Sequence, residues 1–145
     1  MHNKIVQLLE RKGRDVETVP DDATVCDAVA RMNARKIGSV LVRDVLGRPC
    51  GIFTERDVLV RVIVCGIDPK TTPVREVMTR ELVTVAPDTT IREALAIVNQ
   101  RKCRHLPVVD GNGVCGLISS GDLVSWLVRN QQQTIDDLNG YIRAS

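Results

Sequence analysis

The stretches TVPDDATVCDAVARMNARK (residues 18–36) and TVAPDTTIREALAIVNQRK (residues 84–102) decide the fold, because one is a copy of the other. Nine of their nineteen aligned positions are identical, and the copies stand 66 residues apart. Most other positions change to a similar residue, as Val25 to Ile91 and Asp27 to Glu93 do. Self-similarity at a fixed spacing is typical of a repeated structural unit. The chain therefore contains an internal duplication.

The match continues to the end of each copy, where CGIFTERDVL (50–59) aligns with CGLISSGDLV (115–124). Thr24 and Thr90 stand where a helix N-cap belongs, and apolar residues at helical spacing and then two β-rich runs follow. The order in each copy is strand, helix, strand, strand, helix. We therefore expect an α/β (α+β) fold, in which two pseudo-symmetric β-α-β-β-α repeats pack as one module.

The segments outside the copies divide the chain further. We expect an N-terminal helix, a first repeat, a connector, a second repeat and a C-terminal helix, at residues 1–15, 16–66, 67–81, 82–130 and 131–145. The connector contains a short amphipathic piece whose Val74, Val77 and Met78 can pack against a neighbour. The N-terminal segment is expected to serve copy one in the same way.

Apolar helix faces predict self-association. The C-terminal helix carries a stripe at Ile135, Leu138 and Ile142, which needs a partner surface on this chain or on another. Because two-fold association is the commonest symmetric arrangement, we expect a homodimer. The last helices of the two copies carry the surplus apolar residues, namely Val58, Leu59, Val62 and Ile63 in copy one and Leu123, Leu127 and Val128 in copy two.

The composition excludes several classes of protein. With 145 residues, 43% of them hydrophobic, the chain can bury the core of a single domain. Its 20 Lys and Arg against 18 Asp and Glu are too balanced for a surface that coats nucleic acid. No apolar run is long enough to span a membrane, and the first residues are charged where a signal peptide is apolar, so a cytoplasmic protein is expected.

Signals of catalysis or metal binding are sparse. The five cysteines form no CxxC motif and no Cys/His pair at metal-ligand spacing, so we interpret them as reduced, mostly buried thiols. The motifs GxSxG and HExxH and the P-loop are absent. His105 has no neighbouring nucleophile in the sequence, which disfavours a general-base role. The sequence does not predict an enzyme.

One small polar constellation occurs in both copies, at the junction of the last strand with the last helix. One interpretation is helix capping, with the hydroxyl at the N-cap and the carboxylate near the positive end of the helix dipole. The other is a ligand site, in which the free N–H groups of the helix bind an anion and the carboxylate accepts ribose hydroxyls. The constellation comprises Gly51, Thr54 and Asp57 in copy one and Gly116, Ser119 and Asp122 in copy two.

Cationic residues that suit a phosphate follow the first helix of each copy. For Arg104 and His105 we favour this role, because both stand at the start of an expected strand. Arg56 is compatible with either solvent or phosphate. A solvated face explains the others equally well, namely Arg35, Arg101 and Lys102.

These features resemble the cystathionine β-synthase (CBS) domain family, whose paired copies form a Bateman module. The C-terminal part is similar to that of free-standing bacterial CBS-pair proteins. The resemblance covers nearly the whole chain and rests on MNARKIGSVLV (32–42), GIFTERD (51–57), VREVMTRELVTV (74–85), RKCRHLPVVD (101–110) and GLISSGD (116–122).

The resemblance implies an adenosine ligand such as AMP, ADP, ATP, NAD or S-adenosylmethionine, bound in clefts between the copies. We expect no catalytic cofactor and no metal. The resemblance assigns the ribose to Asp57 and Asp122. Because copy one has Gly38 and Ser39 where copy two has Arg104 and His105, one cleft is expected to bind better. The phosphate is assigned to Thr54, Arg56, Arg104, His105 and Ser119, and the base to the region of Thr18, Thr84, Ile37, Gly38 and Pro107.

Three classes of function follow. The leading hypothesis is a regulatory sensor of adenosine nucleotides that signals to a partner protein. The second is a structural or protein-interaction module with no physiological nucleotide. The third is a stress protein that binds a small molecule or metal through its thiols, which the scattered cysteines disfavour. Hydrolase or transferase activity ranks last.

Overall fold

The computed structural model describes the backbone of residues 3–144 and the side chains of residues 3–131 and 139. It divides into two compact units. The copy-one unit comprises Asp15–Leu82, and the copy-two unit comprises Met1–Arg14 together with Val83–Ser145. Each unit therefore contains one copy of the repeat and one segment from outside that copy.

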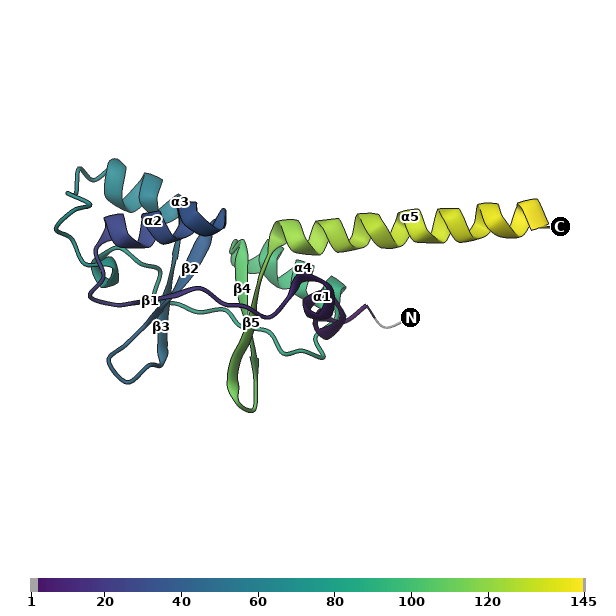
Figure 1. Cartoon of the computed structure of the whole chain (residues 1–145), viewed down its shortest axis with the longest axis horizontal. Helices are drawn as coiled ribbons and strands as arrows, with labels where there is room; N and C mark the ends of the chain where they lie inside the picture. The colour runs from purple at the N-terminus through teal and green to yellow at the C-terminus, as the bar shows by residue number, and fades with distance from the viewer. Residues whose placement is uncertain (1–2, 145) are drawn as a thin grey trace. The chain divides into compact units, whose positions relative to one another are not determined.

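In the copy-one unit, a three-stranded sheet packs against helix α2 (Figure 1). Its elements follow the expected order, although the last helix is mostly of π form. Strand β1 runs parallel to β2, which pairs antiparallel with β3. The elements are β1 (Thr18–Pro20), α2 (Val25–Arg35), β2 (Ser39–Arg43), β3 (Pro49–Thr54), α3 (Glu55–Asp57), the π-helix η1 (Val58–Ile63) and the 3-10 helix η2 (Val74–Glu76).

The copy-two unit is built around an antiparallel hairpin and three helices (Figure 1). The hairpin strands β4 and β5 pair from His105↔Ser119 to Asp110↔Gly113, with a register shift at Cys115. Helices α1, α4 and α5 contribute their apolar residues to one core with the hairpin. The elements are α1 (Ile5–Lys12), α4 (Ile91–Arg101), β4 (His105–Asp110), β5 (Gly113–Ser119) and α5 (Ser120–Ala144).

The strand expected at the start of copy two is reduced to an isolated bridge at Val85. In copy one, the Leu41 amide donates to the carbonyl of Glu17 (3.0 Å). Pro107 occupies the position equivalent to Leu41 and has no N–H to donate. The next two bonds of the ladder remain, from the Val85 amide to the carbonyl of Pro107 (3.0 Å) and from the Val109 amide to the carbonyl of Val85 (2.8 Å). Pro87, at the position equivalent to Asp21, removes the next bond of the copy-one ladder in the same way. Two prolines therefore shorten this strand.

Both expected N-caps are present at the starts of α2 and α4, and each is part of a capping box. The hydroxyl oxygen of Thr24 accepts a bond from the Asp27 amide, and that of Thr90 from the Glu93 amide, each at 3.1 Å. The carboxylates of Asp27 and Glu93 accept in return from the threonine amides, at 3.3 and 3.4 Å. These bonds satisfy donors that the first turn of a helix otherwise leaves unpaired.

The N-terminal segment packs with copy two, so the expectation that it serves copy one is wrong. Ile5, Leu8 and Leu9 of α1 are buried in the core of the copy-two unit. The carbonyl of Asn3 accepts a bond from the amide of Ile91, at the start of α4 (2.7 Å). Helix α1 is thus part of the copy-two fold.

The connector packs with copy one, and its three apolar residues are buried as the sequence predicts. Val74, Val77 and Met78 lie in the core of the copy-one unit. The carbonyl of Thr72 accepts a bond from the amide of Val25, at the start of α2 (3.0 Å). Each copy is therefore completed by the segment that precedes the other copy in the sequence.

The repeated glycines let these segments approach the last strand of each copy. A Cβ atom on Gly116 would stand 2.6 Å from a methyl carbon of Leu9. A Cβ atom on Gly51 would stand 2.5 Å from the sulfur of Met78 and 2.9 Å from the carbonyl oxygen of Thr79. Because real Cβ contacts are longer, a side chain at either position would displace its neighbour. The two glycines therefore have a packing role.

Helix α5 runs without interruption from Ser120 to Ala144, so the boundary expected at residue 131 is absent. Leu123 and Trp126 of its first turns are buried in the core of the copy-two unit. Neither α5 nor any other helix of the described residues is long and apolar enough to cross a membrane. The stripe expected at Ile135, Leu138 and Ile142 lies outside the described side chains.

Candidate functional site

The repeated hydroxyl and carboxylate form a reciprocal pair in each copy. At the end of β3, Oγ1 of Thr54 accepts from the Asp57 amide (3.2 Å), and Oδ2 of Asp57 accepts from the Thr54 amide (3.0 Å). At the end of β5, Oγ of Ser119 accepts from the Asp122 amide (3.1 Å), and Oδ2 of Asp122 accepts from the Ser119 amide (2.8 Å). The helix-capping interpretation is therefore confirmed. An ionised carboxylate still has sites for further donors.

In the copy-one unit, both oxygens of Asp57 have additional partners. The hydroxyl of Thr79 lies 3.0 Å from Oδ1 and 3.3 Å from Oδ2. Nε of Arg61 lies 3.5 Å from Oδ1, and Nη1 of the same guanidinium donates to the carbonyl of Met78 (2.8 Å). The Asp57 side chain is only 7% exposed. This carboxylate is therefore buried among internal donors.

In the copy-two unit, the equivalent carboxylate is more open. Oδ2 of Asp122 accepts from the Ser119 amide and from Nζ of Lys12 (2.6 Å). Neither bond uses Oδ1. The Asp122 side chain is 28% exposed, four times as much as that of Asp57. A ligand hydroxyl can therefore reach Asp122 more easily.

The pKa of Asp122 lies below its ordinary value of 3.8. Burial by itself would raise this pKa, because it disfavours the charged form. Hydrogen bonds from Lys12 and from the Ser119 amide, with the positive charge of Lys12, outweigh the burial. Asp122 is therefore ionised at neutral pH and acts only as a hydrogen-bond acceptor.

The strand register places the phosphate candidates of copy two near this carboxylate. His105 pairs with Ser119 across the β4–β5 ladder, and the carbonyl of Arg104 accepts from the Ser120 amide (2.8 Å). Arg104 is exposed, and His105 is half-buried. The structure thus gathers His105, Ser119 and Asp122 at the start of α5.

In copy one, the same register brings Ser39 opposite Thr54. The carbonyl of Gly38 accepts from the Glu55 amide (3.1 Å), as that of Arg104 does in copy two. Arg56 is exposed to solvent. Copy one therefore repeats the backbone geometry without the two basic side chains.

The residues expected near the base lie at several places in the two units. Thr18 is in β1, where its hydroxyl oxygen accepts from the Arg43 guanidinium (2.8 Å). Ile37 is half-buried just before β2, beside Gly38. Thr84 is exposed ahead of the Val85 bridge, and Pro107 is buried in β4. No recorded hydrogen bond ties these residues to the carboxylate of their own unit.

Arg35 forms an ion pair at the surface of the copy-one unit. Its Nε lies 3.0 Å from a carboxylate oxygen of Glu17. The Arg35 side chain is 64% exposed. This pair fits the interpretation of a solvated face better than a phosphate contact.

The sequence did not single out Lys12, Thr79 or Arg61, which contact the two carboxylates. Arg61 stands four residues after Asp57, a helical spacing that predicts such a contact. Lys12 lies in the N-terminal segment, which packs with copy two, and Thr79 lies in the connector, which packs with copy one. Their roles depend on this packing, which the repeat pattern does not reveal.

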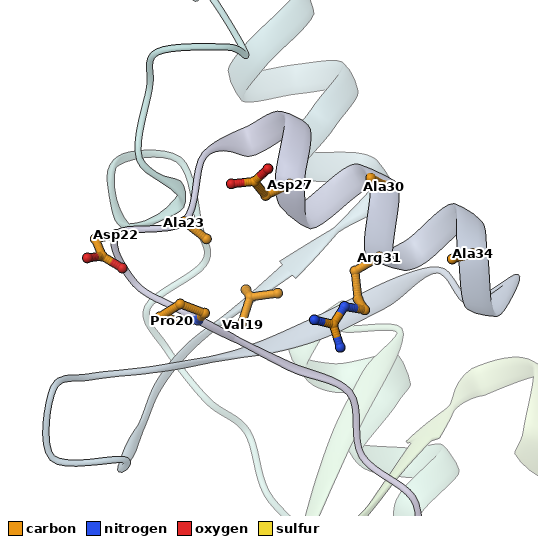
Figure 2. A pocket seen from close by; sticks show the side chains of 8 residues that line it. All are labelled: Val19, Pro20, Asp22, Ala23, Asp27, Ala30, Arg31 and Ala34. Carbon is orange, nitrogen blue, oxygen red and sulfur yellow. The ribbon is translucent and has the colours of Figure 1, made fainter.

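An open pocket of about 670 Å³ lies between β1 and α2 of the copy-one unit (Figure 2). Arg31 extends from α2 toward the strand, and Asp22 and Asp27 stand at the other end of the pocket (Figure 2). Arg31 also pairs with Glu17 at 3.1 Å. The lining residues include none of those that the sequence assigns to a ligand, so the pocket is separate from the Asp57 constellation.

The segment GNGVCG (111–116) has the spacing GxGxxG, which is typical of dinucleotide-binding loops. A dinucleotide-binding loop of this type must join a strand to the start of a helix. Here the segment forms the turn and first half of β5 in a hairpin. It therefore does not indicate a dinucleotide-binding loop.

The cysteines show no sign of a reactive or metal-binding site in the described residues. All five are free, but four are only half-buried and Cys65 is exposed, so the interpretation as mostly buried thiols is wrong. Burial, with smaller contributions from nearby carboxylates, raises the pKa of the Cys50 and Cys115 thiols. No cluster of three or more His, Cys, Asp or Glu in the described part is suited to a metal ion.

Comparison with known proteins identifies the repeat. The family model of the CBS domain matches residues 12–63 and 74–129. The mitochondrial CBS domain-containing protein CBSX3 of Arabidopsis thaliana is 36% identical over 129 residues, which are 84% of this chain and 61% of CBSX3. The chain thus spans less than two thirds of the length of that relative.

Solved structures show the same fold. A CBS-domain containing protein from Agrobacterium tumefaciens is 37% identical, with a TM-score of 0.81 over 86% of this chain and 93% of that one. A CBS domain protein from Pyrobaculum aerophilum, solved in complex with AMP, is 23% identical, with a TM-score of 0.73 over 82% and 88%. Because the family model covers more than half of the residues in two successive matches, this chain belongs to the CBS domain family and carries two CBS domains in tandem.

Proposed function

We propose that this protein is a regulatory module that binds an adenosine nucleotide and performs no catalysis itself. The observation that carries the proposal is the open, ionised carboxylate of Asp122 beside the Ser119 hydroxyl, at the start of α5. The start of a long helix attracts a phosphate, and a carboxylate there can accept ribose hydroxyls. The AMP complex of the Pyrobaculum aerophilum relative supports this class of ligand.

The ligand chemistry common to AMP, ADP, ATP and NAD is an adenosine 5′-phosphate. In our assignment Asp122 binds the ribose, and Ser119, Arg104 and His105 bind the phosphate. Thr54, Asp57 and Arg56 are their counterparts in copy one. The base is assigned to the regions around Thr18, Ile37, Gly38, Thr84 and Pro107.

The two constellations are expected to bind unequally. Asp57 would have to give up or share bonds to Thr79 and Arg61 before it could accept a ribose. Asp122 keeps Oδ1 outside the bonds to Ser119 and Lys12. Copy one also lacks the basic pair next to its hydroxyl. We therefore assign the tighter site to the Asp122 constellation.

The regulatory role requires that the nucleotide bind one state of the protein better than another. A partner protein would then respond to the state that the ligand favours. In such a module the nucleotide dissociates without having been chemically changed.

We also propose that two copies of the chain associate. Leu59 and Ile63 of η1 are 58% and 64% exposed, and the equivalent Val124 and Val128 of α5 are 53% and 59% exposed. The same positions are thus apolar and exposed in both repeats. A second copy offers a surface of the same chemistry, which a two-fold arrangement pairs with itself.

A titration of nucleotides into three variants tests the ligand. Asp122→Asn is expected to raise the Kd of the bound nucleotide by about ten- to a hundredfold, since a hydrogen bond to a charged group is lost. Asp57→Asn should have a smaller effect. Asp88→Asn removes the same charge from an exposed turn and serves as the matched control. Calorimetry measures the Kd of AMP, ADP, ATP and NAD for the parent and for each variant.

The second candidate is a structural or interaction module without a physiological nucleotide. It is favoured by the internal bonds of Asp57, which already explain why that carboxylate is present. It predicts that the parent binds none of the four nucleotides, or that the Asp122 and Asp57 variants bind them as tightly as the parent. Either result would overturn the proposed ligand sites.

A further inference from the structure

Lys12 brings a positive charge to the Asp122 constellation from the far end of the chain. It is the last residue of α1, and its Nζ donates to Oδ2 of Asp122 and to the carbonyl of Leu117, both at 2.6 Å. An ammonium group has three N–H donors, so a third remains after these two bonds. The side chain is 39% exposed, and a ligand at Asp122 can therefore reach it.

The ammonium is held in place by the packing of α1. Leu9, one turn before Lys12, is fully buried in the core of the copy-two unit. The guanidinium of Arg11 stacks on the ring of Trp126 of α5, at 4.7 Å from its centre. A charge that is already positioned costs a ligand little ordering on binding.

The copy-one unit has no lysine in this place. The residue equivalent to Lys12 by the repeat spacing is Met78, and the cation near Asp57 is Arg61 of η1. Trp126 occupies the position equivalent to Arg61 in copy two. Each carboxylate thus has a cation, but in copy two it comes from the N-terminal segment and in copy one from the helix that follows.

We propose that Lys12 determines ligand specificity at the Asp122 constellation by favouring phosphorylated adenosine over adenosine itself. The inference rests on the proposed nucleotide-binding function. The two existing bonds orient the ammonium, and its third N–H and its charge are available to a phosphate oxygen. Adenosine offers the same ribose hydroxyls to Asp122 but no negative charge to Lys12. The difference between the two ligands therefore measures the contribution of the phosphate, and its change between the parent and a Lys12 variant isolates the part that Lys12 supplies.

The experiment compares the Kd of AMP with that of adenosine for the full chain and three variants. Lys12→Met keeps the length of the side chain and removes the charge, and Lys12→Arg keeps the charge. Lys70→Met removes the same charge from an exposed position of the copy-one unit and controls for net charge. Circular dichroism and the fluorescence of Trp126, the single tryptophan, verify that each variant is folded.

We expect Lys12→Met to raise the Kd of AMP about tenfold, as the loss of one charge-assisted hydrogen bond implies, and to leave the Kd of adenosine unchanged. Lys12→Arg should keep most of the preference for AMP, and Lys70→Met should keep all of it. Equal weakening of both ligands would show a merely structural role. Tighter binding of both would show that Lys12 competes with the ribose for Asp122. Either result overturns the inference.

The design separates this inference from the proposed function. If AMP binding depends on Asp122 but not on Lys12, the nucleotide site stands and the specificity role of Lys12 is overturned. If the parent binds neither AMP nor adenosine, the proposed function itself fails, and the role of Lys12 fails with it.

Discussion

Lys12 and Asp122 are separated by 110 residues in the sequence, yet Nζ of one lies 2.6 Å from Oδ2 of the other. This ion pair joins the end of α1 to the start of α5. The same carboxylate caps α5 through the Ser119 amide. One charged group therefore contributes to the helix start, to the attachment of the N-terminal segment and to the proposed ligand site.

Folding stability is expected to depend on the ionisation of Asp122. The pKa of Asp122 is lower in the folded chain than its ordinary value of 3.8, so the charged form stabilises the fold above pH 3.8. This contribution is lost as the pH falls through the lower pKa of the folded state. Asp122→Asn should cost about 0.3 to 1 kcal/mol at neutral pH, and less as the pH falls below 3.8. Urea denaturation of parent and variant across this range measures the difference, and a pH-independent difference would contradict the prediction.

The approach of α1 to β5 predicts a coupling between Gly116 and Leu9. Gly116→Ala should destabilise the fold by about 1 to 3 kcal/mol, because its methyl group overlaps Leu9. Leu9→Ala should cost about 2 to 5 kcal/mol, because it leaves a cavity in the core. The double variant should lose less than the sum, since the new methyl enters the space that Leu9 vacates. Denaturation followed by Trp126 fluorescence measures all three free energies.

The corresponding contact in copy one, between Gly51 and Met78, provides the control. A Cβ atom on Gly51 meets the backbone carbonyl of Thr79 as well as the side chain of Met78. Shortening Met78 to Ala removes only one of these contacts. The coupling between Gly51→Ala and Met78→Ala should therefore be weaker than that between Gly116→Ala and Leu9→Ala. Equal coupling energies for the two pairs would contradict this prediction, because they would show that the α1 segment and the connector move aside equally easily.

The sequence predicted the repeated parts of the fold better than the parts between them. The capping boxes at Thr24 and Thr90 depend on residues three apart, and both are present. The shortened strand at Val85 depends on whether Pro87 and Pro107 stand at positions where the ladder needs an N–H, which alternation alone does not decide. The packing of α1 with copy two and of the connector with copy one depends on the path of the whole chain. No local pattern in the sequence reveals it.

The candidate site was predictable in part for the same reason. The pairing of Thr54 with Asp57, and of Ser119 with Asp122, follows from a local spacing that the repeat shows twice. The cation at Asp122 was not predictable, because Lys12 reaches it only through the packing of α1 on the hairpin. Long-range contacts of this kind require the fold to be known first.

Thiol reactivity is expected to differ among the cysteines. Cys65 is exposed and should react first with iodoacetamide at neutral pH. Cys50 and Cys115 should react more slowly, because burial raises the pKa of each thiol and lowers its thiolate fraction. Peptide mass spectrometry at successive times gives the order of modification. Modification of Cys50 or Cys115 before Cys65 would show that the half-buried thiols are more accessible than the structure indicates.

Self-association through the exposed faces of η1 and α5 predicts how single charges change the molecular mass. Leu59→Asp places a carboxylate on the apolar face of η1 and should shift the dimer toward monomer, since an unpaired charge in an interface is costly. Val45→Asp adds the same group at a hairpin residue that is 93% exposed and should leave the dimer intact. Light scattering at micromolar concentration is expected to give twice 16.0 kDa for the parent and for Val45→Asp. A parent mass of 16.0 kDa would exclude the dimer, and dissociation by Val45→Asp alone would place the interface at the hairpin instead of the helices.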